Sequence, residues 1–493
     1  MPRALTGFSL PGPDLPGAGA AAPARRGRLR RLAQGGAAVG AAAAAALAAA
    51  PSDAGDRTLT GRLTQTFLGD TNLQVDRGGT VGGGRSEGEA AVGSRSRLAL
   101  DYRDATTSSL FTFGGVIDYD IYTGSENDDI SGLFPDLRAG YSLRGARSSL
   151  QLTAFGSAQP IDTLDSSGFS FFDPGVEPTP IDPTDPDPGT PNATLNRTDA
   201  IRTIYGFGVT ANERINSRDS TNFSVSVQRR DFIDGTRALT PSNQLSMGMG
   251  WQRQVSSRIG VGLSYNSSVL KAEGAQDTET YTFSLSPTLS YAATPQKTFS
   301  LSLGPQYSIS DRKQPLPGGT LVPDVGYTIG LRAAAGMTYA YDNVRTAFSL
   351  NQSVTPNDDG DAVNRTTISG SLTQRISAAT SLASRVGVSI ETPLDEGSAG
   401  VSEETLSFDY AATLRHDVNR FTALDFTLGA RLRDDGQDRD VVLSTGAGYG
   451  YRLTEDTGLR LGYEFRLPMG DIDDQDSSHR VSLSLTHDFT LLP

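Results

Sequence analysis

Few side chains in this sequence have the types and spacing that catalysis needs. The 493 residues include three histidines and no cysteine, which excludes disulfides, thiolate metal sites and a thiol nucleophile. A serine hydrolase needs its nucleophile beside a positioned base, and no serine is singled out as a partner for His416, His479 or His487. We therefore predict that the protein is not an enzyme and that it has no catalytic, metal or cofactor-binding residues and no cofactor.

Acidic clusters are the other groups that could bind a ligand. Asp358, Asp359 and Asp361 form one cluster, and residues 471–476 contain a second. They could hold Ca²⁺ or bridge lipopolysaccharide through divalent ions, but they lack the Gly and Glu placement of an EF-hand loop. We interpret them as solvated loop acids. The net charge of -13 also argues against nucleic acid as a partner, because phosphate binding needs a basic face.

The elements that carry these residues follow a period of two. In the segment 278–293, Tyr281, Phe283 and Leu285 alternate with Thr282 and Ser284. Such alternation is typical of a β-strand with one apolar and one polar face. About twenty segments of this kind follow one another from residue 57 onward. Two prolines on the apolar face, Pro287 and Pro305, are expected to mark β-bulges, because proline cannot donate to the ladder.

The links between these segments alternate between short turns and longer loops. Nine short turns are predicted near residues 106–107, 146–147, 217–218, 256–257, 295–296, 342–343, 378–379, 419–420 and 455–456. Longer links rich in Asp, Gly and Pro lie between them, for example 311–324, 356–362 and 470–477. Short turns at one end and long loops at the other are typical of an antiparallel outer-membrane barrel whose termini are both periplasmic.

Aromatic residues recur where alternate segments end, beside the predicted short turns. Such a row predicts a girdle at the periplasmic interface of the membrane. The residues of this predicted girdle are Tyr102, Tyr141, Trp251, Tyr291, Tyr339, Tyr341, Tyr451 and Phe489.

The N-terminal region has the composition of an export signal. A block of arginines between Arg25 and Arg31 precedes an alanine-rich stretch that ends in small residues near Ala54. A basic region, an apolar region and a small-residue zone together indicate a cleaved secretory signal. We predict a signal peptide over 1–54, with a boundary uncertain by about five residues, and a single barrel over 55–493.

The last segment carries a family resemblance. Val481 to Phe489 reads as an alternating apolar strand closed by an aromatic residue, and it is similar to the C-terminal strand that the barrel-assembly machinery recognises. The chain departs from that pattern by continuing to Pro493. As a whole, the sequence resembles bacterial porins and porin-like outer-membrane barrels. The resemblance implies an all-β, up-and-down transmembrane barrel of about 20 strands, within a range of roughly 16–22.

Arginines at the polar positions of the strands are the candidate functional residues. They are expected to line the lumen, where rings of cations favour anions. The alternative is that they pair with lumen acids such as Asp101, Asp118, Asp120, Asp409, Asp425 and Glu464, and thereby stiffen the wall. The predicted lumen-lining residues are Arg62, Arg95, Arg97, Arg138, Arg144, Arg230, Arg332, Arg345, Arg385, Arg415, Arg431, Arg452, Arg460 and Arg466.

The link 158–198 is the longest in the mature chain, and it is acidic and rich in proline. Loops of this length tend to be functional or disordered, so we expect it either to enter the lumen or to remain an external loop.

These features predict a channel in the bacterial outer membrane for passive diffusion of small hydrophilic solutes, with a possible anion preference. The alternative is a non-porin barrel, active in polysaccharide export or serving as a structural surface protein with a blocked lumen. The expected partners are outer-membrane lipid and lipopolysaccharide, the barrel-assembly machinery, and small solutes or polysaccharide.

Overall fold

The computed structural model describes residues 56–73, 89–123, 132–160, 201–233, 241–273, 278–315, 321–356, 362–394, 404–434, 436, 439–470 and 477–492. The regular structure in these ranges consists of twenty β-strands. They are β1 (Asp56–Leu73), β2 (Glu89–Ala105), β3 (Ser109–Thr123), β4 (Gly132–Arg144), β5 (Ser148–Pro160), β6 (Ile201–Arg214), β7 (Asp219–Ile233), β8 (Ser242–Gln254), β9 (Ile259–Ala272), β10 (Thr278–Thr294), β11 (Lys297–Pro315), β12 (Leu321–Tyr341), β13 (Val344–Pro356), β14 (Ala362–Arg375), β15 (Thr380–Pro393), β16 (Thr405–Asp417), β17 (Thr422–Asp434), β18 (Arg439–Arg452), β19 (Thr457–Gly470) and β20 (Ser478–Leu492).

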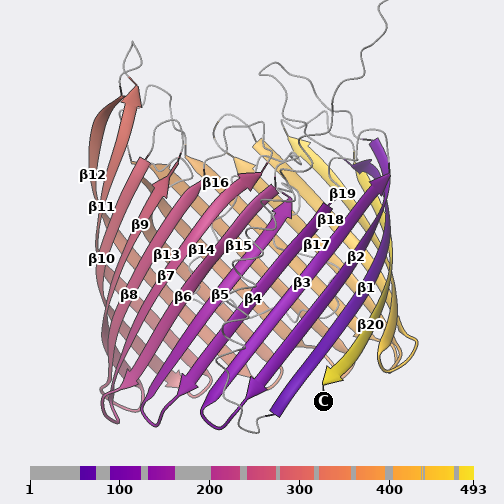
Figure 1. Cartoon of the computed structure of the whole chain (residues 1–493), viewed down its shortest axis with the longest axis horizontal. Coiled ribbons are helices and arrows are strands. Elements are labelled where there is room, and N and C mark those ends of the chain that lie inside the picture. The colour runs from indigo at the N-terminus through magenta and orange to yellow at the C-terminus, as the bar shows by residue number, and fades with distance from the viewer. Residues whose placement is uncertain are drawn as a thin grey trace, which may run out of the picture.

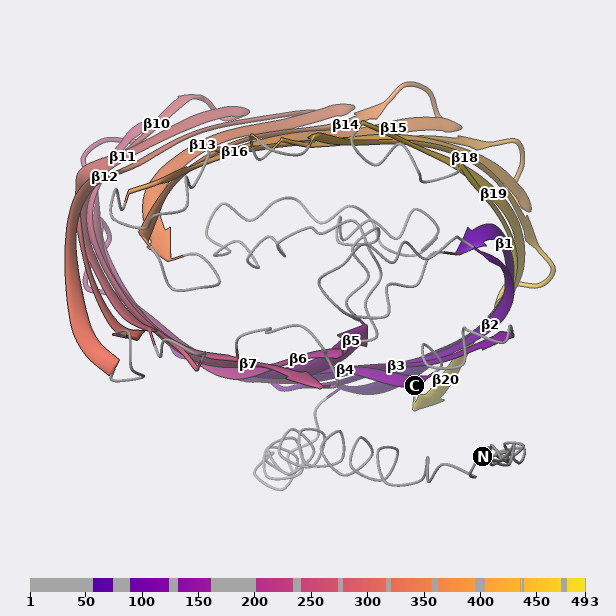
Figure 2. The ribbon, with the colours of Figure 1, turned by 90° about the horizontal axis from the view of Figure 1, so that it is seen from above.

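The strands form one closed antiparallel sheet. Each strand pairs with its neighbours in sequence, and β1 closes the ring by pairing with β20 from Asp70 opposite Arg480 to Leu59 opposite Leu492. The strands are steeply tilted (Figure 1), and the ring is flattened rather than round when it is seen from above (Figure 2). Closure leaves no terminal edge, because the first and last strands hydrogen-bond to each other. The predicted fold, an up-and-down barrel of about twenty strands, is confirmed.

The links follow the predicted alternation only in part. Nine short links join β2 to β3, β4 to β5 and so on to β18 and β19, and each contains a predicted turn. The links at the opposite end join β1 to β2, β3 to β4 and so on to β19 and β20. Most of them are longer, for example 74–88 and 161–200, but 435–438 is as short as several of the turns. The predicted loop 311–324 is wrong in extent, because β11 continues to Pro315 and β12 begins at Leu321. The predicted signal 1–54, most of the loop 158–198 and the two acidic clusters lie outside the described residues.

The outer face carries an apolar band of membrane height. On β11 the outward residues run from Phe299 to Ile309 without a charge, and Lys297 and Asp311 lie just beyond the two ends of this run. These eleven residues match the roughly 9–11 residues that a tilted strand needs to cross a bilayer. Large apolar side chains are exposed all round the barrel, for example Leu63, Leu301 and Leu461. The chain is therefore a transmembrane β-barrel, and such barrels reside in the bacterial outer membrane.

The ring turns sharply at β10 to β12, one narrow end of the flattened barrel (Figure 2). The ladder between β10 and β11 is interrupted beside Pro287 and Pro305, yet the register is the same on both sides of the interruption. The predicted β-bulges at these prolines are therefore wrong. Gly304 lies at the same corner, where an added Cβ would be 2.7 Å from the Ser286 Cα. The missing side chain allows β10 to approach β11 closely.

Candidate functional site

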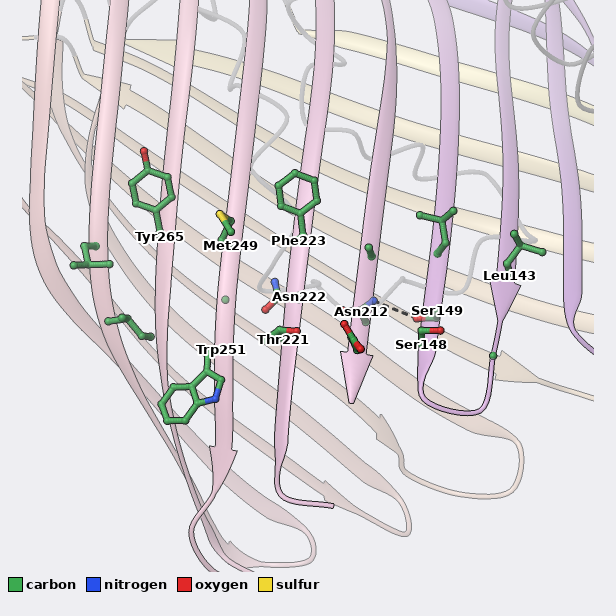
Figure 3. A pocket seen from close by; sticks show the side chains of 17 residues that line it. Leu143, Ser148, Ser149, Asn212, Thr221, Asn222, Phe223, Met249, Trp251 and Tyr265 are labelled. Carbon is green, nitrogen blue, oxygen red and sulfur yellow. Dashed lines mark hydrogen bonds between the residues drawn. The ribbon is translucent and has the colours of Figure 1, made fainter. Parts of the chain in front are cut away.

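The candidate site is the inner face of the barrel wall, which cross-strand pairing defines. Figure 3 views the wall from outside and shows Phe223, Met249 and Trp251 on its outer side. Directly paired residues share a face of a sheet, so the register carries this assignment from strand to strand. On β19 it places Leu461 outside and Arg460 inside. Both faces of every described strand are assigned in this way.

The register places all fourteen arginines named from the sequence on the inner face. They lie on strands all round the barrel, at positions Arg62, Arg95, Arg97, Arg138, Arg144, Arg230, Arg332, Arg345, Arg385, Arg415, Arg431, Arg452, Arg460 and Arg466. Alternation explains this placement for twelve of them, which are one residue away from an outward apolar side chain. Arg95, between Ser94 and Ser96, and Arg230, between Arg229 and Asp231, are placed by the register alone. Their effect on a passing solute depends on which of the fourteen are paired with a carboxylate.

Many of these arginines are neutralised by acids of the neighbouring strand. Arg95 donates two hydrogen bonds of 2.8 Å to Asp120, which is 1% exposed. Arg460 lies 3.0 Å from the buried Asp425. Further cross-strand pairs on the inner face are Arg62–Asp488, Arg97–Asp118, Arg431–Asp409, Arg365–Glu391 and Arg480–Asp70. The middle of the wall is thus lined largely by ion pairs, and it carries less free positive charge than the arginines alone suggest.

A second kind of pair lies within single strands. Arg138 is 3.4 Å from Asp136, and Arg466 is 2.7 Å from Glu464. Arg415 lies 3.1 Å from Asp417. Residues two apart on a strand share a face, so the spacing acid-x-Arg or Arg-x-acid indicates such a pair in sequence. Sequence reasoning missed Asp136 and Asp417, although this signal was present.

The inner rim at the short-turn end differs from the middle of the wall. Six exposed arginines lie within three residues of a strand end there, on the inner face: Arg103, Arg144, Arg214, Arg345, Arg375 and Arg452. In the described part of the chain none of the six has a carboxylate within ion-pair distance. Asp56 and Asp101 are the unpaired acids nearest this rim on the same face. We call these six arginines the rim arginines. They are spread over β2, β4, β6, β13, β14 and β18.

The predicted girdle residues all lie on the outer face towards the short-turn end. They are Tyr102, Tyr141, Trp251, Tyr291, Tyr339, Tyr341, Tyr451 and Phe489. Several pack on neighbouring rings. Tyr291 stacks on Phe299 at 6.4 Å, and Tyr339 stacks on Tyr341 at 6.5 Å between ring centroids. An aromatic row of this kind suits the boundary between lipid and water.

The three histidines are on the outer face, and the ring of each shares a hydrogen bond with one hydroxyl group. His416 shares a hydrogen bond of 2.9 Å with Thr380, and His487 shares one of 3.0 Å with Thr457. His479 contacts the Tyr463 hydroxyl at 2.8 Å. Within the described ranges, no group of three or more acids or histidines is placed to hold a metal ion. No helix in those ranges has the length and apolar character needed to cross a membrane.

A hollow of about 950 Å³ lies on the outer side of the wall across β4 to β10 (Figure 3). Leu143, Phe223, Met249, Trp251 and Tyr265 are among its lining residues. Its lining is mostly apolar, as the membrane-facing side of a barrel requires. The hollow opens on the outer face of the wall, whereas the arginines are on the inner face. It is therefore separate from the candidate site.

Comparisons with known proteins give similarities of structure only. No protein-family model matches the chain, and no curated protein matches it. The ferric-catecholate import receptor Fiu from E. coli, in its open form, has a TM-score of 0.47 at 8% identity, over 89% of this chain and 82% of that one. OccK2 from Pseudomonas aeruginosa has a TM-score of 0.40 at 11% identity, over 89% of this chain and 99% of that one. The siderophore receptor PirA from Pseudomonas aeruginosa scores 0.42 at 12% identity, over 89% and 81%. The function proposed below therefore rests on the geometry of the wall.

Proposed function

We propose that the protein is an outer-membrane channel through which small hydrophilic solutes diffuse passively, with a preference for anions. A barrel of sixteen or more strands encloses a lumen wider than its side chains fill, and this one has twenty. Its inner face is lined by arginines, acids, serines and threonines, whereas its outer face is apolar. On this proposal the outer face contacts membrane lipid and lipopolysaccharide, and the barrel-assembly machinery inserts the chain.

The rim arginines carry the anion preference. An arginine paired with a carboxylate contributes little field at a distance, because the two charges cancel. Among the described residues the rim arginines have no such partner, and they are exposed around one mouth of the lumen. A ring of cations at a pore mouth raises the local concentration of anions and lowers that of cations. On this proposal the selective element lies at the mouth formed by the short turns, which would face the periplasm.

Planar-bilayer recordings test both parts of the proposal. Reconstituted protein should give stable conductance steps. Its reversal potential in a KCl gradient should show that chloride permeates more readily than potassium. Replacing Arg144, Arg214, Arg375 and Arg452 by glutamine should move the permeability ratio towards unity. The matched control replaces four arginines of the short turns at the same end by glutamine: Arg147, Arg218, Arg258 and Arg420. It removes the same charge but should change the ratio little.

Two outcomes would contradict the proposal. Equal shifts in the two variants would mean that total charge, and not the inner rim, determines selectivity. Absence of stable steps in the unmodified protein would favour a barrel with a blocked lumen, or one that exports polysaccharide with other proteins. Salt offers a further check, because the Debye length falls from about 10 Å at 0.1 M to about 3 Å at 1 M. The anion preference should therefore weaken at high salt.

A further inference from the structure

The wall of the barrel has an incomplete seam between β12 and β13. Their ladder runs from Tyr341 opposite Val344 to Ala333 opposite Gln352. Above that point β12 continues to Leu321 with β11 on one side. Within the described residues, no strand pairs with the other edge of residues 321–332. This edge exposes main-chain N–H and C=O groups of β12.

Half of the open edge lies at membrane height. The apolar band on β11, from Phe299 to Ile309, pairs with residues 327–337 of β12. The open edge therefore overlaps the band over residues 327–332. The outward side chains there are unusually bare, since Ile329 is 82% exposed and Tyr327 is 67% exposed. A strand edge in contact with lipid hydrocarbon is not tolerated unless it is buried in protein or lines a wet cavity.

The end of β13 lies behind β12, on its inner side (Figure 2). Val354 belongs to the outward face of β13, yet it is 3% exposed because it packs against the inner face of β12 at Gly330. An added Cβ on Gly330 would be 3.7 Å from the Val354 Cβ. The two strands therefore overlap in two layers instead of lying side by side. We call this arrangement the lapped seam.

One side chain holds the lapped seam by hydrogen bonds. The Gln306 side-chain amide, on the inner face of β11, donates to the Val354 carbonyl oxygen and accepts from the Val354 N–H at 3.0 Å. It thereby takes the place of a strand partner for Val354. Gln306 is 3% exposed, so these bonds are shielded from water. Two hydrogen bonds from one amide hold the strands less firmly than a continuous ladder of main-chain hydrogen bonds would.

The existing register would allow the seam to close. Continuing it upward from the pair Ala333–Gln352 sets Leu331 opposite Val354 and Ile329 opposite Pro356. Closure would cover most of the edge that lies at membrane height. It would exchange the two Gln306 hydrogen bonds for ladder bonds, and it needs no change in the lower part of the seam. The lapped and the closed seam are thus two arrangements of the same strands.

We propose that the β12–β13 seam is a lateral opening of the wall for an anionic amphiphile, and that the lapped seam is its open state. The outer side of the opening presents Leu331 and Ile329 to an apolar tail. Its edge presents main-chain groups that a polar head can hydrogen-bond. On the inner side the main chain of Arg332 is at the end of the open edge, and its guanidinium extends across β11 towards β10, where it donates to the Ser284 hydroxyl at 3.2 Å. In the described part it has no carboxylate partner, so an anionic head can approach it.

Paired cysteines test the two states, because the chain has no cysteine of its own. The pair Gly330→Cys and Val354→Cys should form a disulfide in the lapped seam, since disulfides need a Cβ separation of about 3.5–4.5 Å. The pair Leu331→Cys and Val354→Cys should form one only in the closed seam. The pair Ala335→Cys and Leu350→Cys is directly paired in both states and serves as the positive control. Oxidation with copper–phenanthroline in proteoliposomes should cross-link all three pairs, and gel shifts on heating confirm that each variant is folded.

Photolabelling then tests passage. The probe is a diazirine-bearing sixteen-carbon carboxylate added to the same proteoliposomes. With the seam locked open through Gly330→Cys and Val354→Cys, labels should be found on both outward and inward residues of β10 to β12. With the seam locked closed through Leu331→Cys and Val354→Cys, labels should be confined to outward residues. Failure of either test pair to cross-link while the control pair does so, or identical labelling in the two locked states, would overturn the proposal.

Discussion

At the scale of single residues, the parity of a position determines which solvent its side chain meets. Val225 on β7 faces outward and pairs with Val209 and Met247, whereas the adjacent Ser226 faces inward and is exposed. Successive side chains of a strand face lipid and water in turn. A protein of low overall hydrophobicity can therefore span a membrane. Identical substitutions at adjacent residues should therefore have very different effects.

We predict that Val225→Arg will impair assembly strongly and that Ser226→Arg will be tolerated. A charged side chain at the lipid midplane costs about 2–4 kcal/mol, whereas an inward position remains hydrated. The measurement is urea-induced unfolding in lipid vesicles, followed by tryptophan fluorescence from Trp251. If both variants lost stability equally, the face assignment of β7 would be wrong.

At the scale of elements, the corner at β10 to β12 depends on one missing side chain. An added Cβ at Gly304 would meet the Ser286 Cα at 2.7 Å, whereas nothing lies within 4 Å of an added Cβ at Gly387. Both glycines lie on inner faces, and both belong to strand interiors. They differ in the approach of the neighbouring backbone, which cannot move as a flexible side chain could.

Gly304→Ala should destabilise the barrel by about 1–3 kcal/mol, as overpacking of a tight contact does. Gly387→Ala should be neutral or slightly stabilising, because alanine restricts the unfolded chain more than glycine does. Unfolding midpoints of the two variants in the same lipid would measure the difference. A neutral effect of Gly304→Ala would mean that β10 can shift at the corner, and the lapped seam should then be re-examined by the cysteine pairs.

At the scale of the whole molecule, closure accounts for stability without a central apolar core. The contact between β1 and β20 joins residues more than 400 positions apart, as in the hydrogen bond between Arg62 and Asp488. Closure satisfies the edges of the first and last strands together. The barrel should therefore unfold cooperatively, as one unit.

We expect heat-modifiable migration on gels, in which the unheated protein runs as a compact band and the boiled protein runs at its full mass. A chain ending at Gly470 lacks β20 and leaves β1 and β19 with open edges, so it should show no compact band. Recovery of a compact, protease-resistant band from the truncated chain would contradict closure as the source of stability.

The sequence by itself determined the strands, their faces and the nine short turns. Alternation in segments such as the one around Tyr281, Phe283 and Leu285 is a local property, because neighbouring residues on a strand point to opposite sides whatever the strand packs against. Every predicted short turn lies in a short link of the structure. The fourteen arginines also reached the inner face for this reason, since parity alone decides it.

Tertiary structure alone decided which of these arginines are paired with a carboxylate and where the wall is incomplete. Neutralisation depends on a cross-strand partner, and Arg62 finds its partner Asp488 at the far end of the chain. Local patterns carry no information on such a pairing until the strand register is known. The lapped seam is less predictable still, because the register of β12 and β13 would allow the ladder to continue. The packing of Val354 on Gly330 and the Gln306 amide decide it, and these contacts exist only once the ring has closed and bent at its corner.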